Sequence, residues 1–198
     1  MKELPLFPLR TVLFPRGQLS LKVFEQRYLD MVRDCVRDDG RFGVCLVTTE
    51  GEGPVGMAAY GTSARISDWF TRDDGLLGIV ATGERRYRLE RTWAQPNGLL
   101  CAKVAWLDEA PCTVPPDCSV LVTLLRQIIE QIEIEIPGVE ERDFDDASFV
   151  AHRLAELLPL ELMERQSVLE IDDPEARLRE VFLLLRQVQE RQRSEENE

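Results

Sequence analysis

The sequence predicts an α+β protein with a β-rich N-terminal part and a helical C-terminal part. Up to about residue 113, apolar residues form short runs of strand length separated by turn sequences. From about residue 118 onward, apolar residues recur instead at the period of an α-helix. The proline-containing segment 110–118 lies where the pattern changes. We therefore expect two domains, residues 1–113 and residues 118–198.

The β-rich part contains four segments that are typical of strands. Some are short apolar runs, others alternate apolar and polar residues, and turn sequences separate the later ones. Successive strands joined by short turns favour a small barrel or a pair of packed sheets. The opening stretch, residues 4–15, contains prolines that limit its hydrogen bonds, so we expect an edge strand followed by a loop. The four expected strands are 42–47, 55–70, 75–93 and 99–107.

One helix interrupts the strands early in the chain. Helical spacing predicts that one face of this helix carries Phe24, Tyr28, either Met31 or Val32, and Cys35. Gly40 is expected to end it, because glycine readily adopts the left-handed conformation found after helices.

Helical periodicity continues through the C-terminal part. The last helix has the clearest start, because Asp173 can cap it and Pro174 suits its first position. Its apolar run at 181–185 is broader than one core stripe requires, which fits either a homodimer contact or a well-buried terminal helix. The expected helices are 119–136, 147–158, 160–170 and a last one beginning at 173–174.

The charge is concentrated in the helical part. The chain has a net charge of −12, of which residues 1–118 contribute −1 and residues 119–198 contribute −11. A strongly acidic chain gains little from phosphate contacts, so nucleic acid is disfavoured as a partner. The N-terminus lacks the pattern of a secretory signal, and no apolar run has the length of a membrane span. We therefore expect a cytoplasmic protein with no membrane partner.

The cysteines indicate neither disulfides nor a metal site. They form an odd set without a C-x-x-C pair, so buried or free thiols in a reducing compartment are the simplest interpretation. The single histidine, His152, is expected on a helix rather than in a zinc site. We expect no metal and no cofactor. The cysteines are Cys35, Cys45, Cys101, Cys112 and Cys118.

The usual motifs of catalysis are missing from the sequence. It has no G-x-x-x-x-G-K-[ST] loop, no G-x-G-x-x-G after a strand and no H-E-x-x-H. Ser20 and Lys22 share one face of an expected strand, but a Ser–Lys dyad also needs a desolvated lysine and an oxyanion hole. The simpler interpretation is that Ser20 and Lys22 are two exposed residues on a strand. The arginines of 83–91 are better explained as the outer face of a strand than as an anion site.

A few large or charged residues near turns are candidates for a binding surface. Such side chains either close the core or form the contact surface for a peptide, and the sequence alone leaves both interpretations open. The candidates for polypeptide binding are Phe14, Pro15, Arg16, Trp69 and Phe70, and we expect no catalytic residue.

The opening of the chain combines an apolar, proline-containing stretch, an expected strand and an expected helix in "LPLFPL" at 4–9, "LFPRGQLSL" at 13–21 and "VFEQRYLDMV" at 23–32. This order of motifs resembles the start of the N-terminal, substrate-binding domain of the Lon proteases. Arg16 stands where the family commonly has glycine. The matching residues are Leu4, Pro5, Leu6, Pro8, Leu9, Arg10, Phe14 and Pro15.

The resemblance extends along nearly the whole chain. Two expected strands match family patterns through Gly61, Thr62, Ala64 and Ile66 and through Val80, Gly83, Arg86 and Leu89. In the helical part, Arg165 replaces a family lysine. The matching residues there are Gln166, Leu169, Glu170, Asp173, Arg177 and Leu178.

The resemblance implies a PUA-like β-barrel or pseudo-barrel domain with one inserted helix, followed by a C-terminal helical bundle. The 198 residues stop where the ATPase and peptidase domains of the full proteases would begin, so the resemblance is to stand-alone proteins of this family. It implies a non-catalytic module that binds unfolded or partner polypeptides, among them a separate protease or chaperone. The alternatives are an RNA-binding PUA-like module, which the acidic charge opposes, and an uncharacterised hydrolase.

Overall fold

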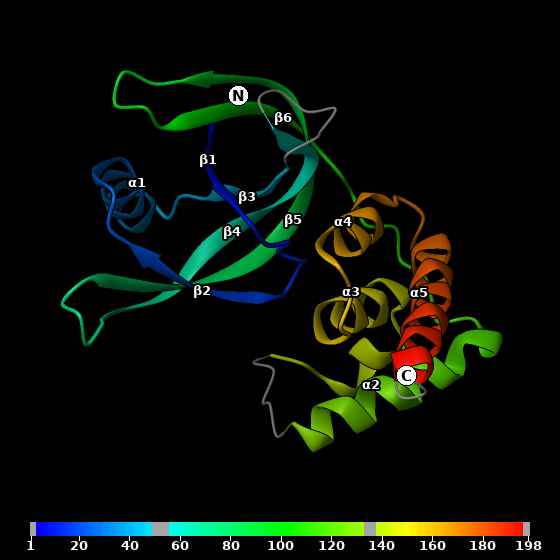
Figure 1. The fold of residues 1–198 in the computed structure, drawn as a ribbon. Coiled ribbons are helices and arrows are strands. Elements are labelled where there is room, and N and C mark those ends of the chain that lie inside the picture. The colour runs from blue at the N-terminus through cyan, green and yellow to red at the C-terminus, as the bar shows by residue number, and fades with distance from the viewer. Residues whose placement is uncertain (1–2, 49–55, 133–137, 196–198) are drawn as a thin grey trace. The chain divides into compact units, whose positions relative to one another are not determined.

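The computed structural model describes residues 3–48, 56–132 and 138–195. The chain divides into two compact units, Met1–Asp108 and Glu109–Glu198, which are drawn in Figure 1. Within the described ranges, no helix is both long and apolar enough to cross a lipid bilayer.

The first unit is built on a mixed sheet with the strand order β2-β5-β4-β3-β1-β6, and β5 also pairs with β6. Among the strand pairs of the described residues, β1–β3 alone is parallel. The four expected strands are confirmed as β3, β4, β5 and β6, with ends shifted by a few residues. The elements are β1 Leu4–Leu9, β2 Gln18–Val23, α1 Gln26–Arg37, β3 Phe42–Val47, β4 Met57–Thr71, β5 Leu77–Ala94 and β6 Leu100–Trp106.

The first strand differs from the expected edge strand. β1 pairs with β6 at Leu4 and Pro5 and with β3 along Leu6–Leu9, so it lies between these two strands in the sheet order. Pro5 and Pro8 are both accommodated within these ladders. Pairing with β6 stops at Pro5, and no described strand lies on that side of residues 6–9. β1 is therefore an interior strand of the sheet order, and its second half has a β-sheet partner on one side among the described strands.

Helix α1 packs onto the sheet through Met31, Val32 and Cys35. It begins at Gln26, two residues after Phe24, which is 62% exposed. The expectation that Phe24 lies on the buried helical face is therefore wrong. The physical reason is that Glu25, the N-cap, has extended backbone angles, so the chain has not yet turned into the helix at Phe24.

The second unit consists of helices with two short 3₁₀ turns. Helix α3 packs against α2, α4 and α5, and residues 147–155 on it are all buried, including His152. The expected cap of the last helix is confirmed, because Asp173 Oδ1 accepts a hydrogen bond from the Ala176 amide at 2.7 Å. The expected end of the first helix, 133–136, lies outside the described residues. The elements are η1 Pro116–Cys118, α2 Ser119–Gln131, η2 Glu141–Asp145, α3 Ala147–Leu157, α4 Leu162–Glu170 and α5 Pro174–Glu195.

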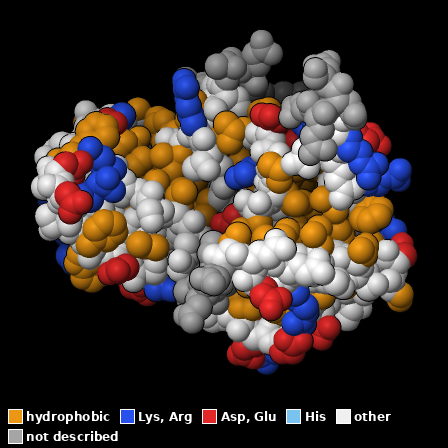
Figure 2. Space-filling view, turned by 60° about the horizontal axis from the view of Figure 1, so that its bottom comes forward, with side chains coloured by type: hydrophobic (Ala, Val, Ile, Leu, Met, Phe, Trp, Pro, Cys, Tyr) orange, Lys and Arg blue, Asp and Glu red, His pale blue; other side chains and the backbone are white. Residues whose placement is uncertain are grey.

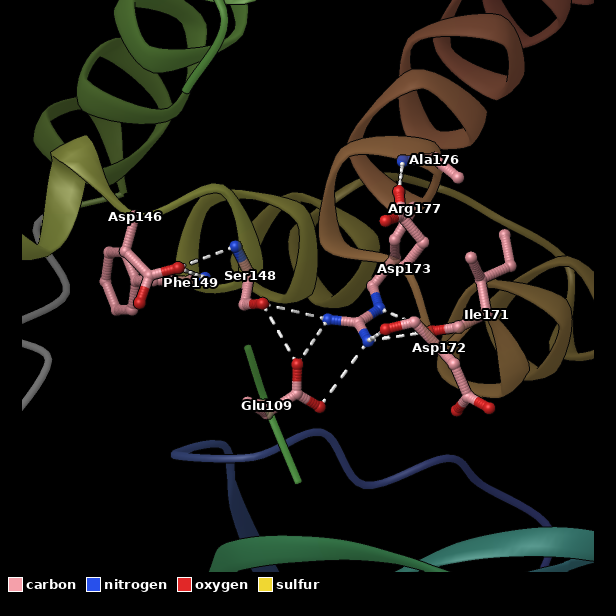
Figure 3. Close-up of polar contacts among 9 residues, drawn as sticks. All are labelled: Glu109, Asp146, Ser148, Phe149, Ile171, Asp172, Asp173, Ala176 and Arg177. Atoms are coloured by element: carbon pink, nitrogen blue, oxygen red, sulfur yellow. Dashed lines mark hydrogen bonds and ion pairs between the residues drawn. The ribbon is translucent and has the colours of Figure 1, made fainter. Parts of the chain in front are cut away.

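The segment that precedes these helices is attached to them by polar contacts. The fully buried guanidinium of Arg177 pairs with the Glu109 carboxylate at 2.9 Å and donates to Ser148 Oγ at 3.1 Å (Figure 3). It also donates to the Ile171 carbonyl at 2.7 Å. One arginine thus joins the start of the unit, α3 and the α4–α5 loop. Further along, the Ala147 amide donates to the Cys112 carbonyl at 2.8 Å.

Candidate functional site

The loop that was expected to present Phe14, Pro15 and Arg16 does not expose all three. Phe14 is 0% exposed, so its placement on a binding surface is corrected, whereas Pro15 is half-buried and Arg16 is exposed. The loop is held against β5, because the Arg16 amide donates to the Gly83 carbonyl at 2.7 Å. A side chain at Gly83 would place its Cβ 2.2 Å from the Phe14 carbonyl oxygen, so this close approach requires glycine.

Trp69 and Phe70 are exposed at 59% and 42%, but they lie on opposite faces of the sheet. Successive strand residues alternate between faces, and Trp69 pairs with the buried Ile79 while Phe70 pairs with Gly78. The Phe70 ring covers Gly78, since a Cβ there would lie 2.6 Å from ring carbons.

The five predicted residues therefore do not form one patch. The Phe14 loop contacts β5 at Gly83, and Phe70 covers Gly78, five residues away on the same strand. At the usual rise of a strand this is a separation of about 17 Å. The role of Pro15, Arg16, Trp69 and Phe70 in binding stays a prediction.

A different set of apolar side chains surrounds a hollow of about 450 Å³, which we call the β1–α1 groove. It lies beside the half of β1 that has no second neighbour, and the start of α1 and strand β2 close its other sides. Lys22, Glu25 and Arg27 supply its polar lining. Its apolar lining is Phe7, Pro8, Leu9, Leu21, Phe24, Tyr28 and Leu100.

The wall of the groove is ordered by aromatic packing. The rings of Phe7 and Tyr28 stack with centroids 4.0 Å apart and planes 3° apart. The Arg27 guanidinium lies over the Tyr28 ring at 4.9 Å, donates to the Gly98 carbonyl at 3.1 Å and pairs with Glu25 at 2.7 Å. Burial raises the pKa of the Tyr28 hydroxyl, so it remains neutral at physiological pH. Phe24 is the most exposed of the large apolar residues that line the groove, at 62%.

Phe70 is the one predicted residue that the strand register connects with the groove. Lys22, which lines the groove, and Phe70 are both cross-strand partners of Gly78, so the two side chains lie on the same face. Lys22 Nζ also pairs with Asp74 at 2.7 Å in the β4–β5 turn. Figure 2, in which the β2 side of Figure 1 comes forward, shows hydrophobic side chains gathered on the β-rich unit.

The residues considered for catalysis are arranged differently from an active site. Lys22 is ion-paired and about two-fifths exposed, which is the opposite of a desolvated catalytic lysine, and Ser20 is exposed. Among the described residues, no group of three or more His, Cys, Asp or Glu side chains has the arrangement of a metal site. All five cysteines are free thiols. Arg86 is buried, which corrects the expectation that the arginines of 83–91 all lie on an outer face.

Several residues with a structural or surface role had no clear signal in the sequence. Phe24 fits helical spacing, so only the observed start of α1 reveals its exposure. Arg177 appears in the family pattern, but its partner Glu109 is 68 residues away and has no local signal. Helical spacing places Tyr28 on the shared face of the first helix, but its stacking on Phe7 depends on the position of β1 beneath α1.

Comparison with known proteins identifies the family. The sequence profile of the ATP-dependent protease La (LON) substrate-binding domain matches residues 3–187. The chain therefore belongs to the LON substrate-binding domain family. It is 30% identical to Lon protease 2 of Myxococcus xanthus over 94% of this chain and 24% of that protein. It is 29% identical to the Lon protease of Cytophaga hutchinsonii over 86% of this chain and 22% of that protein.

Solved structures show the same mixed α/β fold. A Lon N-terminal domain protein from Xanthomonas campestris superposes with a TM-score of 0.78 at 39% identity, over 92% of this chain and 98% of that chain. The N-terminal domain of Mycobacterium avium complex Lon protease has the same fold, with a TM-score of 0.66 at 17% identity. The chain spans about a quarter of the length of the Lon proteases named above, and the matched part is the substrate-binding domain.

Proposed function

We propose that this chain is a non-catalytic recognition module that binds unfolded or partner polypeptides through the β1–α1 groove. The observation that carries the proposal is an apolar hollow with an exposed phenylalanine in a chain of the LON substrate-binding domain family. Exposed apolar surface of this kind is typical of interaction sites. The proposal includes action in the cytoplasm, alongside a separate protease or chaperone.

The proposal extends to the finer description of the fold. The strand pairings run from β5 through β4, β3, β1 and β6 back to β5, which supports a PUA-like pseudo-barrel. Helices α2 to α5 then correspond to the helical bundle. We also propose that the helical domain begins near Glu109, because this residue and Cys112 contact α3 or α5.

The test is binding of a fluorescently labelled, reduced and carboxymethylated polypeptide, followed by fluorescence anisotropy. Phe24→Ser removes the exposed ring from the groove and is expected to weaken binding about fivefold, since a contact residue of this size contributes about 1 kcal/mol. The matched control is Met163→Ser on α4, which removes an apolar side chain of similar exposure outside the groove. The control is expected to bind as the native chain does.

Two results would count against this function. If the native chain does not bind the polypeptide at high micromolar concentration, the module does not recognise unfolded chains. If Phe24→Ser and Met163→Ser bind equally well, the β1–α1 groove is not the contact surface.

A further inference from the structure

A second hollow of the β-rich unit, with a volume of about 460 Å³, has a different chemistry. We call it the acidic cavity. It lies between the start of β1, the C-terminal half of α1 and strand β6, and Leu4, Met31 and Leu99 contribute apolar side chains to it. This volume is within the range of pockets that hold small ligands or single side chains.

The lining of the acidic cavity carries four carboxylates and one guanidinium. The carboxylates belong to Glu3, Asp34, Asp38 and Asp39, and the guanidinium belongs to Arg41. Arg41 pairs with Asp39 at 3.1 Å and is also held by a carboxylate outside the lining. The lining by itself therefore has an excess of negative charge.

Arginines outside the lining reduce this excess without removing it. Arg37 pairs with Asp38 at 2.9 Å and reaches Asp34 at 3.4 Å. Arg33 also pairs with Asp34, at 3.3 Å, but it shares its guanidinium with Asp30 at 2.9 Å. Each arginine near the rim is thus divided between two carboxylates.

The negative charge reaches the inner surface of the cavity. Two buried thiols, Cys35 and Cys101, line it. Burial first, and then the charge of Asp34, raises the pKa of Cys35 to about 11. Burial and then the charge of Glu3 raise the pKa of Cys101. The carboxylates of Asp34 and Glu3 therefore act on the inner surface of the cavity, although the burial that dominates both shifts disfavours a charge of either sign.

An aromatic ring completes the lining. Trp106 is 43% exposed, and it already accepts one cation, since the Arg85 guanidinium lies 5.6 Å from its ring centroid. An indole ring attracts ammonium and guanidinium groups, and adjacent apolar surface accommodates the methylene stem of a basic side chain.

We propose that the acidic cavity binds a lysine or arginine side chain of a polypeptide, and so gives this module a preference for basic segments. The carboxylates attract the cation, while Trp106 and the apolar lining pack against its stem. The proposal rests on the polypeptide binding proposed above, and it adds a specificity that the apolar groove cannot supply.

The experiment compares two capped ten-residue peptides that share a Gly/Ser-rich sequence with a Leu-X-Leu centre. X is arginine in one peptide and citrulline, its neutral isostere, in the other. Binding to the full chain is followed at low salt by ¹⁹F NMR of 5-fluorotryptophan, with the Trp106 signal assigned from Trp106→Phe. We expect the arginine peptide to bind about tenfold more tightly and to shift the Trp106 signal.

A pair of double variants tests the location. Glu3→Gln/Asp39→Asn removes two carboxylates of the cavity, and asparagine tolerates the left-handed backbone at residue 39, where φ is 45°. It is expected to lose most of the preference for arginine. Asp73→Asn/Asp145→Asn makes the same change in net charge at exposed sites outside the cavity and is expected to retain the preference.

The outcomes separate this inference from the proposed function. Equal affinity for the two peptides, or the same loss in both double variants, would overturn the acidic cavity as a basic side-chain site while leaving groove binding intact. Failure of both peptides and of the carboxymethylated polypeptide would reject the proposed function itself. If capped arginine alone binds as tightly as the arginine peptide, the site takes a small free cation and the polypeptide assignment is wrong.

Discussion

At the scale of single residues, glycines in the strands make space for a buried tyrosine. Tyr87 is fully buried, and its hydroxyl donates to the Val44 carbonyl at 3.0 Å. A Cβ at Gly43 would lie 2.6 Å from the Tyr87 hydroxyl, and a Cβ at Gly61 would lie 2.5 Å from it. Both positions therefore exclude a larger residue, but they differ in what surrounds them.

The difference predicts a ranking of two alanine variants. At Gly61 the added methyl group would also lie 2.3 Å from the Val44 carbonyl oxygen, whereas at Gly43 its other close neighbours are the leucine side chains of β1. Side chains can shift more easily than a paired backbone. We expect Gly61→Ala to lower the free energy of unfolding by about 3 kcal/mol and Gly43→Ala to lower it by less. Urea denaturation followed by circular dichroism measures both, and a larger loss for Gly43→Ala would contradict the argument.

At the scale of elements, the β4–β5 turn is tied to β2 by one ion pair. The hydrogen bond that Lys22 Nζ donates to Asp74, supported by the Leu76 amide, lowers the pKa of the Asp74 carboxyl. The folded pKa lies below the unfolded value, so the pair favours the folded hairpin above the unfolded pKa. Its contribution is lost as the pH falls through the folded pKa.

This pair gives a prediction for one carboxyl group. Lys22→Met removes the first cause of the shift, so the pKa of Asp74 is expected to rise toward its ordinary value. A ¹³C NMR titration of the aspartate carboxyl groups measures the change. Asp117, whose pKa is lowered by Arg179, is the internal control and is expected to keep its value. An unchanged Asp74 titration would show that Lys22 does not hold the turn in solution.

The same scale explains how far the candidate site was predictable. Periodicity located the strands and helices, because each depends on its own repeating pattern of apolar residues. Trp69 and Phe70 are surface candidates in the sequence, but adjacent strand residues face opposite ways, so the two side chains do not lie on one surface. The β1–α1 groove combines side chains from four elements, and no local sequence pattern contains that combination.

At the scale of the whole molecule, the helical unit includes the segment that begins at Glu109. Arg177 is fully buried, and Glu109 is its carboxylate partner. Removing the carboxylate partner of a buried guanidinium is costly, because the charge stays inside the unit and is less well compensated there. The segment that begins at Glu109 therefore contributes to the stability of the helical unit, although Glu109 itself lies outside any helix.

This dependence predicts how fragments behave. A fragment of residues 109–198 is expected to fold with helical circular dichroism, and a fragment of residues 115–198 is expected to be less stable by about 2 kcal/mol or more. Glu109→Gln in the longer fragment removes the charge while keeping the backbone contacts, and it is expected to account for much of that loss. Thermal unfolding measures all three. Equal stability of the two fragments would show that the unit begins at or after residue 115.

The sequence by itself determined the division into strands and helices, the cap of α5 and the membership of the LON substrate-binding domain family. These features depend on residues close together in the chain, or on motifs whose order along it is diagnostic. Only the tertiary structure decided that Phe14 is buried, that Phe24 is exposed and that Arg177 pairs with Glu109. Each of these depends on which distant segments approach one another, and such an approach is set by packing of the whole unit rather than by local periodicity.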